Sequence, residues 1–78
     1  MSARRPNGVS IQAGSRIRFS YVNYRMEKSE REAIVLAIFY GTTEYHPDKQ
    51  WFIRAHDLEK EAMREFAMKD MTNVQVVS

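Results

Sequence analysis

The absence of cysteine from so short a chain is the feature that most constrains its fold. The 78 residues allow one domain, and neither disulfides nor thiolate metal sites can brace it. Domains of this size bury only about 60% of their unfolded surface and usually need some additional stabilisation. The two histidines, His46 and His56, cannot complete a structural zinc site alone. We therefore expect a homo-oligomer, with no metal or other cofactor.

The overall composition is that of a folded domain outside the membrane. Apolar residues make up 44% of the chain and aromatic residues 12%. No apolar run approaches the roughly 20 residues that cross a bilayer, and no apolar segment follows the arginines near the N-terminus. Together with the absence of cysteine, these features favour a cytoplasmic location.

Charge is distributed unevenly along the chain. Residues 1–25 carry five arginines and no acidic residue, whereas residues 26–78 carry seven basic and ten acidic residues. One end of the molecule is therefore a candidate anion-facing surface, with Arg16 and Arg18 as its members inside the domain. A solvated basic tail without a partner is an equally weighted alternative.

The first regular element is expected just after a polar leader. Residues 1–15 are rich in Ser, Arg, Gly, Asn and Pro, which predicts a flexible basic leader before a single domain over residues 16–78. From Arg16 to Tyr24 apolar and polar residues alternate, and this period of two is typical of a half-buried strand. Its apolar face consists of Ile17, Phe19 and Tyr21.

Two further strands are expected in the middle of the chain. Residues 31–40 are apolar on both faces and rich in β-branched and aromatic side chains, which favours a buried strand after a hairpin turn at residues 25–30. Residues 41–50 contain Pro47 and predict a loop, because proline has no backbone donor for a ladder. Residues 51–58 alternate again and predict a strand.

The stretch 57–71 admits two interpretations. It is composed of strong helix formers, and Asp57 is a suitable N-cap, so local propensity predicts a helix and an α+β fold. Residues 72–77 are β-branched and predict a closing strand.

Several motifs in the second half of the chain resemble those of the WYL domain family. The similarity covers about residues 16–77. Each motif is degenerate by itself, and the order and spacing of the motifs together make the match more specific. Upstream, residues 17–21 and 31–38 resemble the first two strands of the family, although Val35 stands where proline is frequent. The matching motifs are Trp51-Phe52-Ile53, Ala55-His56-Asp57-Leu58, Arg64-Glu65-Phe66 and Met71.

The resemblance implies a mainly β fold, a small Sm-like or Src-homology-type barrel of about five bent strands. Residues 62–68 then form a strand, residues 59–61 its hairpin turn, and residues 68–71 a single turn before the last strand. We follow the resemblance here, because tertiary context often overrides weak helix preferences. A helix over residues 57–71 is the alternative.

The resemblance also implies a function. WYL domains accompany bacterial transcription regulators and defence systems, and nucleotides or single-stranded nucleic acids are their favoured ligands. A chain this short resembles a stand-alone module of a phage or bacterium, so we expect a non-enzymatic module that binds a nucleotide or single-stranded nucleic acid. The alternative is a protein-interaction module, such as a phage-encoded inhibitor of a host defence protein, since its five methionines suit an adaptable surface.

Basic and aromatic residues around the family motifs form the candidate ligand site. Arginine offers a planar fork for phosphate, and exposed aromatic rings stack on bases. Core packing of Trp51 competes with ligand stacking, and pairing of the arginines with acids such as Glu65 competes with phosphate binding. The candidate ligand-binding residues are Tyr45, His46, Gln50, Trp51, Arg54, His56 and Arg64.

Two positions depart from the family pattern and bear on that site. Phe52 stands in place of a tyrosine and lacks its hydroxyl, and Asp70 stands where a second arginine is frequent. Neither an HExxH motif nor a paired-carboxylate or nucleophile-elbow arrangement is present, so no catalytic residues are predicted.

Overall fold

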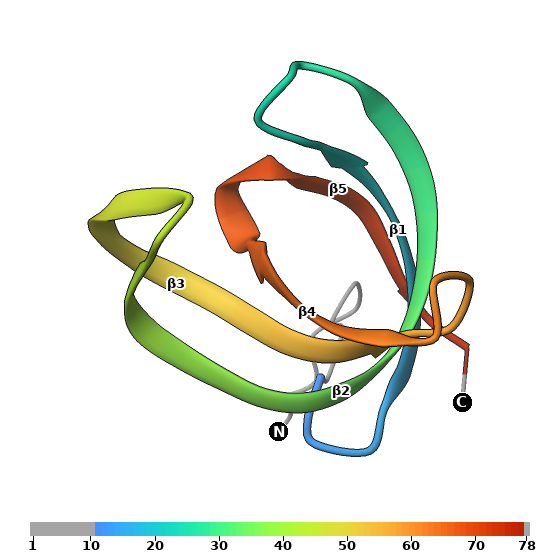
Figure 1. Ribbon diagram of the computed structural model, residues 1–78. Helices are drawn as coiled ribbons and strands as arrows, with labels where there is room; N and C mark the ends of the chain where they lie inside the picture. Colours follow the sequence, from blue (N-terminus) through green and yellow to red (C-terminus); the bar gives the residue numbers. More distant parts are fainter. Residues whose placement is uncertain (1–10, 78) are drawn as a thin grey trace, which may run out of the picture.

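Antiparallel strands make up most of the protein. The computed structural model describes residues 11–77 (Figure 1). Its strands pair in the order β4-β3-β2-β1-β5, so the last strand returns beside the first. The fold is mainly β, as the resemblance implied. The strands are β1 (Arg16–Val22), β2 (Lys28–Thr43), β3 (His46–Asp57), β4 (Ala62–Ala67) and β5 (Met71–Val76).

The long strand β2 bends the sheet upon itself. Its first half pairs with β1 from Lys28 to Ile34, and from Ala33 to Thr43 it pairs with β3. The register of β2 against β3 shifts between Val35 and Ala37, and such a bulge bends a strand and increases its twist. In Figure 1 the bent β2 curves around β4 and β5, and the sheet curls into a small barrel.

The core lies inside this curl and is dominated by aromatic rings. Phe19 and Tyr21 from β1 meet Phe66 of β4, with edge-to-face ring centroids 5.0 Å apart for each contact with Phe66. The Tyr21 hydroxyl oxygen also accepts a 3.0 Å hydrogen bond from the backbone N–H of Ala67. The remaining core residues are Ile17, Ala33, Val35, Ile53 and Ala55.

Residues 57–71 form a hairpin and a short turn, and the helix suggested by propensity is wrong. In the β3–β4 register Phe66 lies opposite Ile53, and both side chains are buried in the core. A helix over these residues would not form this pairing. The carboxylate of Asp57 caps the hairpin turn by accepting hydrogen bonds from the N–H groups of Glu59 and Lys60. A 3-10 turn, η1 (Met68–Asp70), then leads into β5.

The loop predicted over residues 41–50 is also wrong, because strands occupy most of it. β2 continues to Thr43 and β3 begins at His46, so the turn between them is confined to residues 44 and 45. Pro47 is accommodated because the register shifts at this end of the hairpin, between Gly41 and Thr43, and proline is tolerated at such irregularities.

The predicted leader lies mostly outside the described residues. Of its residues 1–15, the last five are described, and Ile11 packs against the core. Gly14 adopts a φ of 93°, which suits a residue without Cβ, and its N–H donates to the carbonyl of Val35. No helix within residues 11–77 has the length and apolar character needed to cross a membrane.

Candidate ligand-binding pocket

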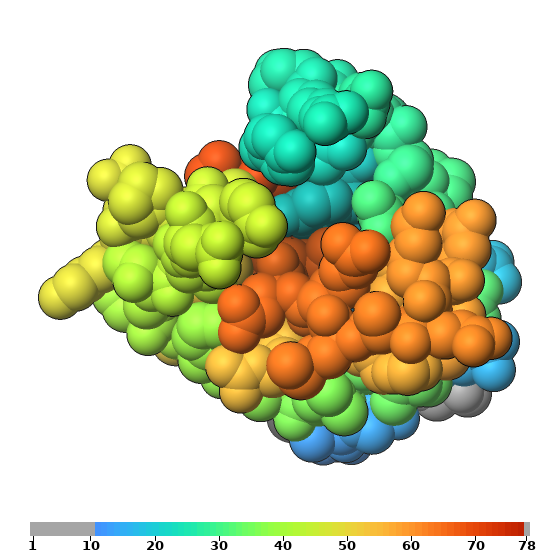
Figure 2. Space-filling model, viewed as in Figure 1, coloured from blue at the N-terminus to red at the C-terminus, as the bar shows by residue number. Residues whose placement is uncertain are grey.

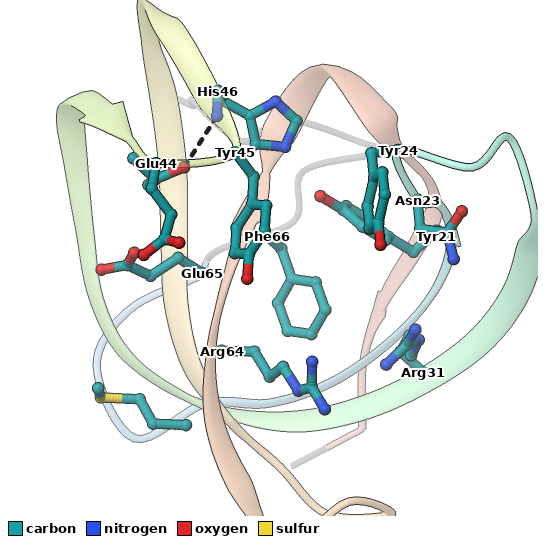
Figure 3. Close-up of a pocket in the computed structure, with 12 residues that line it drawn as sticks. Tyr21, Asn23, Tyr24, Arg31, Glu44, Tyr45, His46, Arg64, Glu65 and Phe66 are labelled. Carbon is teal, nitrogen blue, oxygen red and sulfur yellow. Dashed lines mark hydrogen bonds between the residues drawn. The ribbon is translucent and has the colours of Figure 1, made fainter.

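A pocket opens where the curl of the sheet leaves two hairpin turns facing β4. Its volume is about 570 Å³, within the range of small-molecule sites. Figure 2 shows the hollow between the β1–β2 turn, the β2–β3 turn and β4, and Figure 3 shows the residues that line it. They are Tyr21, Asn23, Tyr24, Arg31, Thr43, Glu44, Tyr45, His46, Met63, Arg64, Glu65 and Phe66.

Two tyrosines from different turns form the aromatic wall. Tyr24 stacks on Tyr45 with ring centroids 5.9 Å apart and an interplanar angle of 18°, and both side chains are largely exposed. The Asn23 side chain accepts hydrogen bonds from the N–H groups of Arg25 and Glu27, which holds the turn that presents Tyr24. The pocket thus offers two aromatic faces at its mouth.

Arg64 supplies a cation on the inner face of the sheet. In the β3–β4 register Arg64 lies directly opposite Ala55, and directly opposed residues of antiparallel strands share a face. Because Ala55 belongs to the core, Arg64 extends toward the interior of the curl, as Figure 3 shows. Among residues 11–77 no carboxylate lies within ion-pairing distance of its guanidinium. Arg64 is therefore available to an anion.

Arg31 is the second guanidinium in the pocket, and it is held in place by neighbouring side chains. Its Nη1 donates a 2.9 Å hydrogen bond to Asp57, whose side chain is fully buried, and its Nε donates to Ser29. The guanidinium lies 5.9 Å from the ring centroid of Phe66. Arg31 thus joins the pocket with its orientation already set and its charge balanced by Asp57.

Hydrogen bonding keeps the buried carboxylate of Asp57 ionised. Burial by itself raises the pKa of Asp57, but hydrogen bonds from Lys60 N–H, from Arg31 and from Glu59 N–H outweigh burial and leave the pKa below its ordinary value. In contrast, burial raises the pKa of the Tyr21 hydroxyl at the floor of the pocket, which stays protonated at neutral pH.

Three of the predicted site residues meet in this pocket: Tyr45, His46 and Arg64. The backbone N–H of His46 donates to the Thr43 hydroxyl at 3.2 Å, the bond drawn in Figure 3. The ring of His46 lies against Phe52, with centroids 5.7 Å apart. Phe52 is fully buried, so the position where the family has tyrosine packs here and does not reach the pocket.

The structure separates Gln50 and Trp51 from the pocket. Trp51 packs edge-to-face on Tyr40, with centroids 5.3 Å apart, and 54% of Trp51 is exposed, so core packing, the alternative to ligand binding for this residue, is wrong. Trp51 alternates with the buried Ile53, which suggests that both are core residues. However, Trp51 lies in the part of the β2–β3 hairpin that extends beyond the core. The Gln50 amide nitrogen donates to the carbonyl of Asp48, and its buried carbonyl oxygen has no hydrogen-bond partner within residues 11–77.

Arg54 and His56 also lie outside the pocket. Arg54 donates from Nε and Nη2 to one carboxylate oxygen of Glu65, at 3.1 and 2.9 Å, and its guanidinium lies 4.9 Å from the Phe39 ring centroid. His56 pairs with Met63 in the β3–β4 register. Arg54 and His56 are two residues apart on β3 and share one face, whereas Ala55 and its cross-strand partner Arg64 lie on the other face.

The predicted anion-facing arginines are partly neutralised. Glu32 on β2 lies directly opposite Arg18 and diagonally from Arg16, and it forms an ion pair with each of them. The hydrogen bond from Arg16, with the charges of both arginines, lowers the pKa of the Glu32 carboxyl. Arg16 and Arg18 therefore form an ion-pair cluster with Glu32 on the outer face of β1, in which two guanidinium groups share one carboxylate.

The sequence interpretation missed Tyr24 and Arg31. The alternating pattern predicts that Tyr24 ends a strand, whereas its exposed position beside Tyr45 depends on the bend of β2. Arg31 pairs with Phe19 in the β1–β2 register, which turns it toward the core side. The alternation of β1, extended through the hairpin, was the signal that would have found it. Within residues 11–77 no cluster of His, Asp and Glu that would hold a metal is present.

A comparison with protein-family models agrees with the fold and the motifs. The model for the WYL domain matches residues 9–76, which is nearly the whole chain. A search of curated proteins found no significant match. The matched range contains every strand and every residue of the pocket. The chain belongs to the WYL domain family.

Proposed function

We propose that this WYL domain binds a nucleotide or a short single-stranded nucleic acid in the pocket between its hairpin turns, without catalysing a reaction. The observation that carries the proposal is the position of Arg64, whose guanidinium shares a cavity with the stacked rings of Tyr24 and Tyr45. The phosphate and the base of a nucleotide both find complementary groups within one cavity. A cytoplasmic location accords with such a ligand.

The chemistry of the lining suits both parts of the ligand. A guanidinium forms charge-assisted, bidentate hydrogen bonds with phosphate oxygens. Stacking of a base on an aromatic ring contributes about 1–3 kcal/mol per base, irrespective of sequence. The two tyrosines are exposed at the mouth, so a base can stack on either ring without unfolding the core.

The charge balance of the lining favours one phosphate over a polyphosphate. Arg31 is offset by Asp57, and Glu65 is offset by Arg54. Of the remaining charged residues in the lining, Arg64 is the single cation and Glu44 the single anion among the described residues. A triphosphate would therefore bring more negative charge than the pocket compensates.

Isothermal titration calorimetry at low salt tests the proposal, with adenosine monophosphate and a short oligothymidylate as probes. We expect Arg64→Ala to weaken binding about tenfold or more, because it removes a charge-assisted hydrogen bond. Tyr45→Ala should weaken binding by about tenfold through lost stacking. The matched control Arg54→Ala, on the outer face, should change the affinity by less than about twofold.

Absence of binding by both probes, with the wild-type protein folded, would exclude the proposed function. Equal losses for Arg64→Ala and Arg54→Ala would relocate binding to the outer face of the sheet. Turnover of the probe during titration would contradict the non-enzymatic part of the proposal.

A further inference from the structure

The second half of β2 leaves one edge of the sheet open. On one edge of β2, pairing with β1 extends only from Lys28 to Ile34. The last backbone hydrogen bond there that starts on β2 runs from the N–H of Val35 to the carbonyl of Ser15. From Leu36 to Thr43, β2 pairs with β3 on one side and with no strand among the described residues on the other. Its outward N–H and C=O groups form a template for another strand.

This edge lacks the features by which proteins protect open strands. Residues 34–43 contain no charged residue and no proline. Instead, large apolar side chains are exposed on it or beside it, with exposed fractions from 41% to 56%. These side chains are Leu36, Ile38, Tyr40 and Trp51. An uncharged, apolar edge of this length is normally covered in the working molecule.

The other two edges of the sheet are protected. The outer edge strand β4 carries Arg64 and Glu65 in its middle. β5 is short, contains Asn73 with a φ of 53°, and its register against β1 shifts between Arg18 and Ser20. Charges and irregularities of this kind disfavour pairing with another chain. The contrast singles out β2.

We propose that Leu36–Thr43 of β2 pairs antiparallel with the same segment of a second copy, giving a two-fold dimer with a continuous sheet. Antiparallel pairing of identical strands is two-fold by construction, so the surface is its own partner. An axis through Tyr40 opposes Tyr40 to itself, Ile38 to Thr42 and Ala37 to Thr43 of the second copy, and it uses nearly the whole open edge. No charged residue then faces another across the paired strands.

Charge at the two ends of the edge supports a second copy over an unrelated strand. One end stops at Ser15, which precedes the basic residue Arg16, and the other end stops at the acidic residue Glu44. The two-fold axis brings Glu44 of each copy toward the Arg16 end of the other, where Arg16 and Arg18 share the single carboxylate of Glu32 and leave the cluster net positive. The four apolar side chains and the paired backbone would bury on the order of 500 Å² per copy, which is typical of a weak dimer.

Analytical ultracentrifugation over a concentration series tests the dimer on the full chain. We expect the wild type to shift from monomer to dimer as concentration rises. Ile38→Lys should weaken association about tenfold or more, because a paired edge would bury the ammonium group. The matched control Met63→Lys, at a similarly exposed residue on β4, should leave association unchanged.

A cross-link then tests the register, since the chain contains no native cysteine. Tyr40→Cys lies on the proposed axis, opposite its own copy, and should give a disulfide-linked dimer on mild oxidation, whereas Met63→Cys should not. A wild type that remains monomeric at every concentration overturns the proposal. So does a dimer that Ile38→Lys leaves intact, or one that cross-links through Met63→Cys and not through Tyr40→Cys.

Discussion

Single residues decide how charge is handled inside this small barrel. Asp57 has no exposed surface, yet it remains a carboxylate because it caps the β3–β4 turn and pairs with Arg31 of β2. One side chain therefore ties a hairpin turn to a neighbouring strand and orients a guanidinium at the pocket. Breaking such a buried pair leaves the other charge uncompensated.

Asp57→Asn is expected to lower the free energy of unfolding by about 3 kcal/mol at pH 7. The pKa of Asp57 is lowered by folding, so its stabilising contribution is complete above the ordinary aspartate pKa and is lost as pH falls through the lower, folded-state pKa. Urea denaturation from pH 7 to pH 3 should show the difference between wild type and variant shrinking below about pH 4. A difference that is constant with pH would contradict the role assigned to the carboxylate.

Tyr21→Phe is expected to lower the free energy of unfolding by about 1–2 kcal/mol, because it leaves the buried N–H of Ala67 without an acceptor. The measurement is chemical denaturation at neutral pH. Tyr40→Phe serves as the control, because Tyr40 is 56% exposed and water replaces its hydroxyl contacts. Equal effects of the two substitutions would argue against a structural hydrogen bond at Tyr21.

At the scale of elements, two of the three non-glycine residues with a positive φ among residues 11–77, Met26 and Glu61, lie in turns between strands. Met26 closes the β1–β2 turn with a φ of 65°, and its N–H donates to the carbonyl of Asn23 at 2.8 Å. This left-handed conformation is costly for a residue with a Cβ, and glycine is the usual choice at this position of a hairpin. The 81% exposure of Met26 shows that its side chain contributes little packing in return.

Met26→Gly is therefore expected to raise the free energy of unfolding by about 0.5–1 kcal/mol. Thermal denaturation followed by circular dichroism would record the gain as a higher melting temperature. The control is Arg25→Gly in the same turn, where the wild-type backbone has no positive φ to relieve. Arg25→Gly should leave the melting temperature unchanged or lower it.

At the scale of the whole molecule, most of the arginines that lie on the strands are engaged in ion pairs. Arg16, Arg18, Arg31 and Arg54 all pair with carboxylates, and Arg64 is the cation left in the pocket. Nucleic-acid binding depends on salt through the number of phosphates that the protein neutralises. The molecule should thus bind through one main phosphate contact.

For oligothymidylate, we expect the logarithm of the association constant to fall with the logarithm of salt concentration at a slope of about −0.7 to −1. Titrations between low and moderate salt measure it, and Arg64→Ala should reduce the slope toward zero. A slope several times steeper would show that other arginines contact phosphate. In that case the charge balance of the pocket would not govern affinity.

The sequence alone determined the existence of the five strands and the family, but not where β2 begins and ends or where β3 begins. Alternation located β1 and the second half of β3, β-branched content located the middle of β2 and most of β5, and the family motifs outweighed helix propensity over residues 57–71. These properties are readable because alternation specifies which side chains share a face. The resemblance also led to Tyr45, His46 and Arg64, which the pocket brings together.

Only the tertiary structure decided which charges remain free and which aromatic rings meet. The bulge in β2 bends the sheet until the turns bearing Tyr24 and Tyr45 touch, and strand register pairs Arg54 with Glu65 while leaving Arg64 on the inner face. Alternation cannot reveal these contacts, because it describes one strand at a time. Pairing and bending depend on several strands at once, and they separate a neutralised arginine from one that is free to bind.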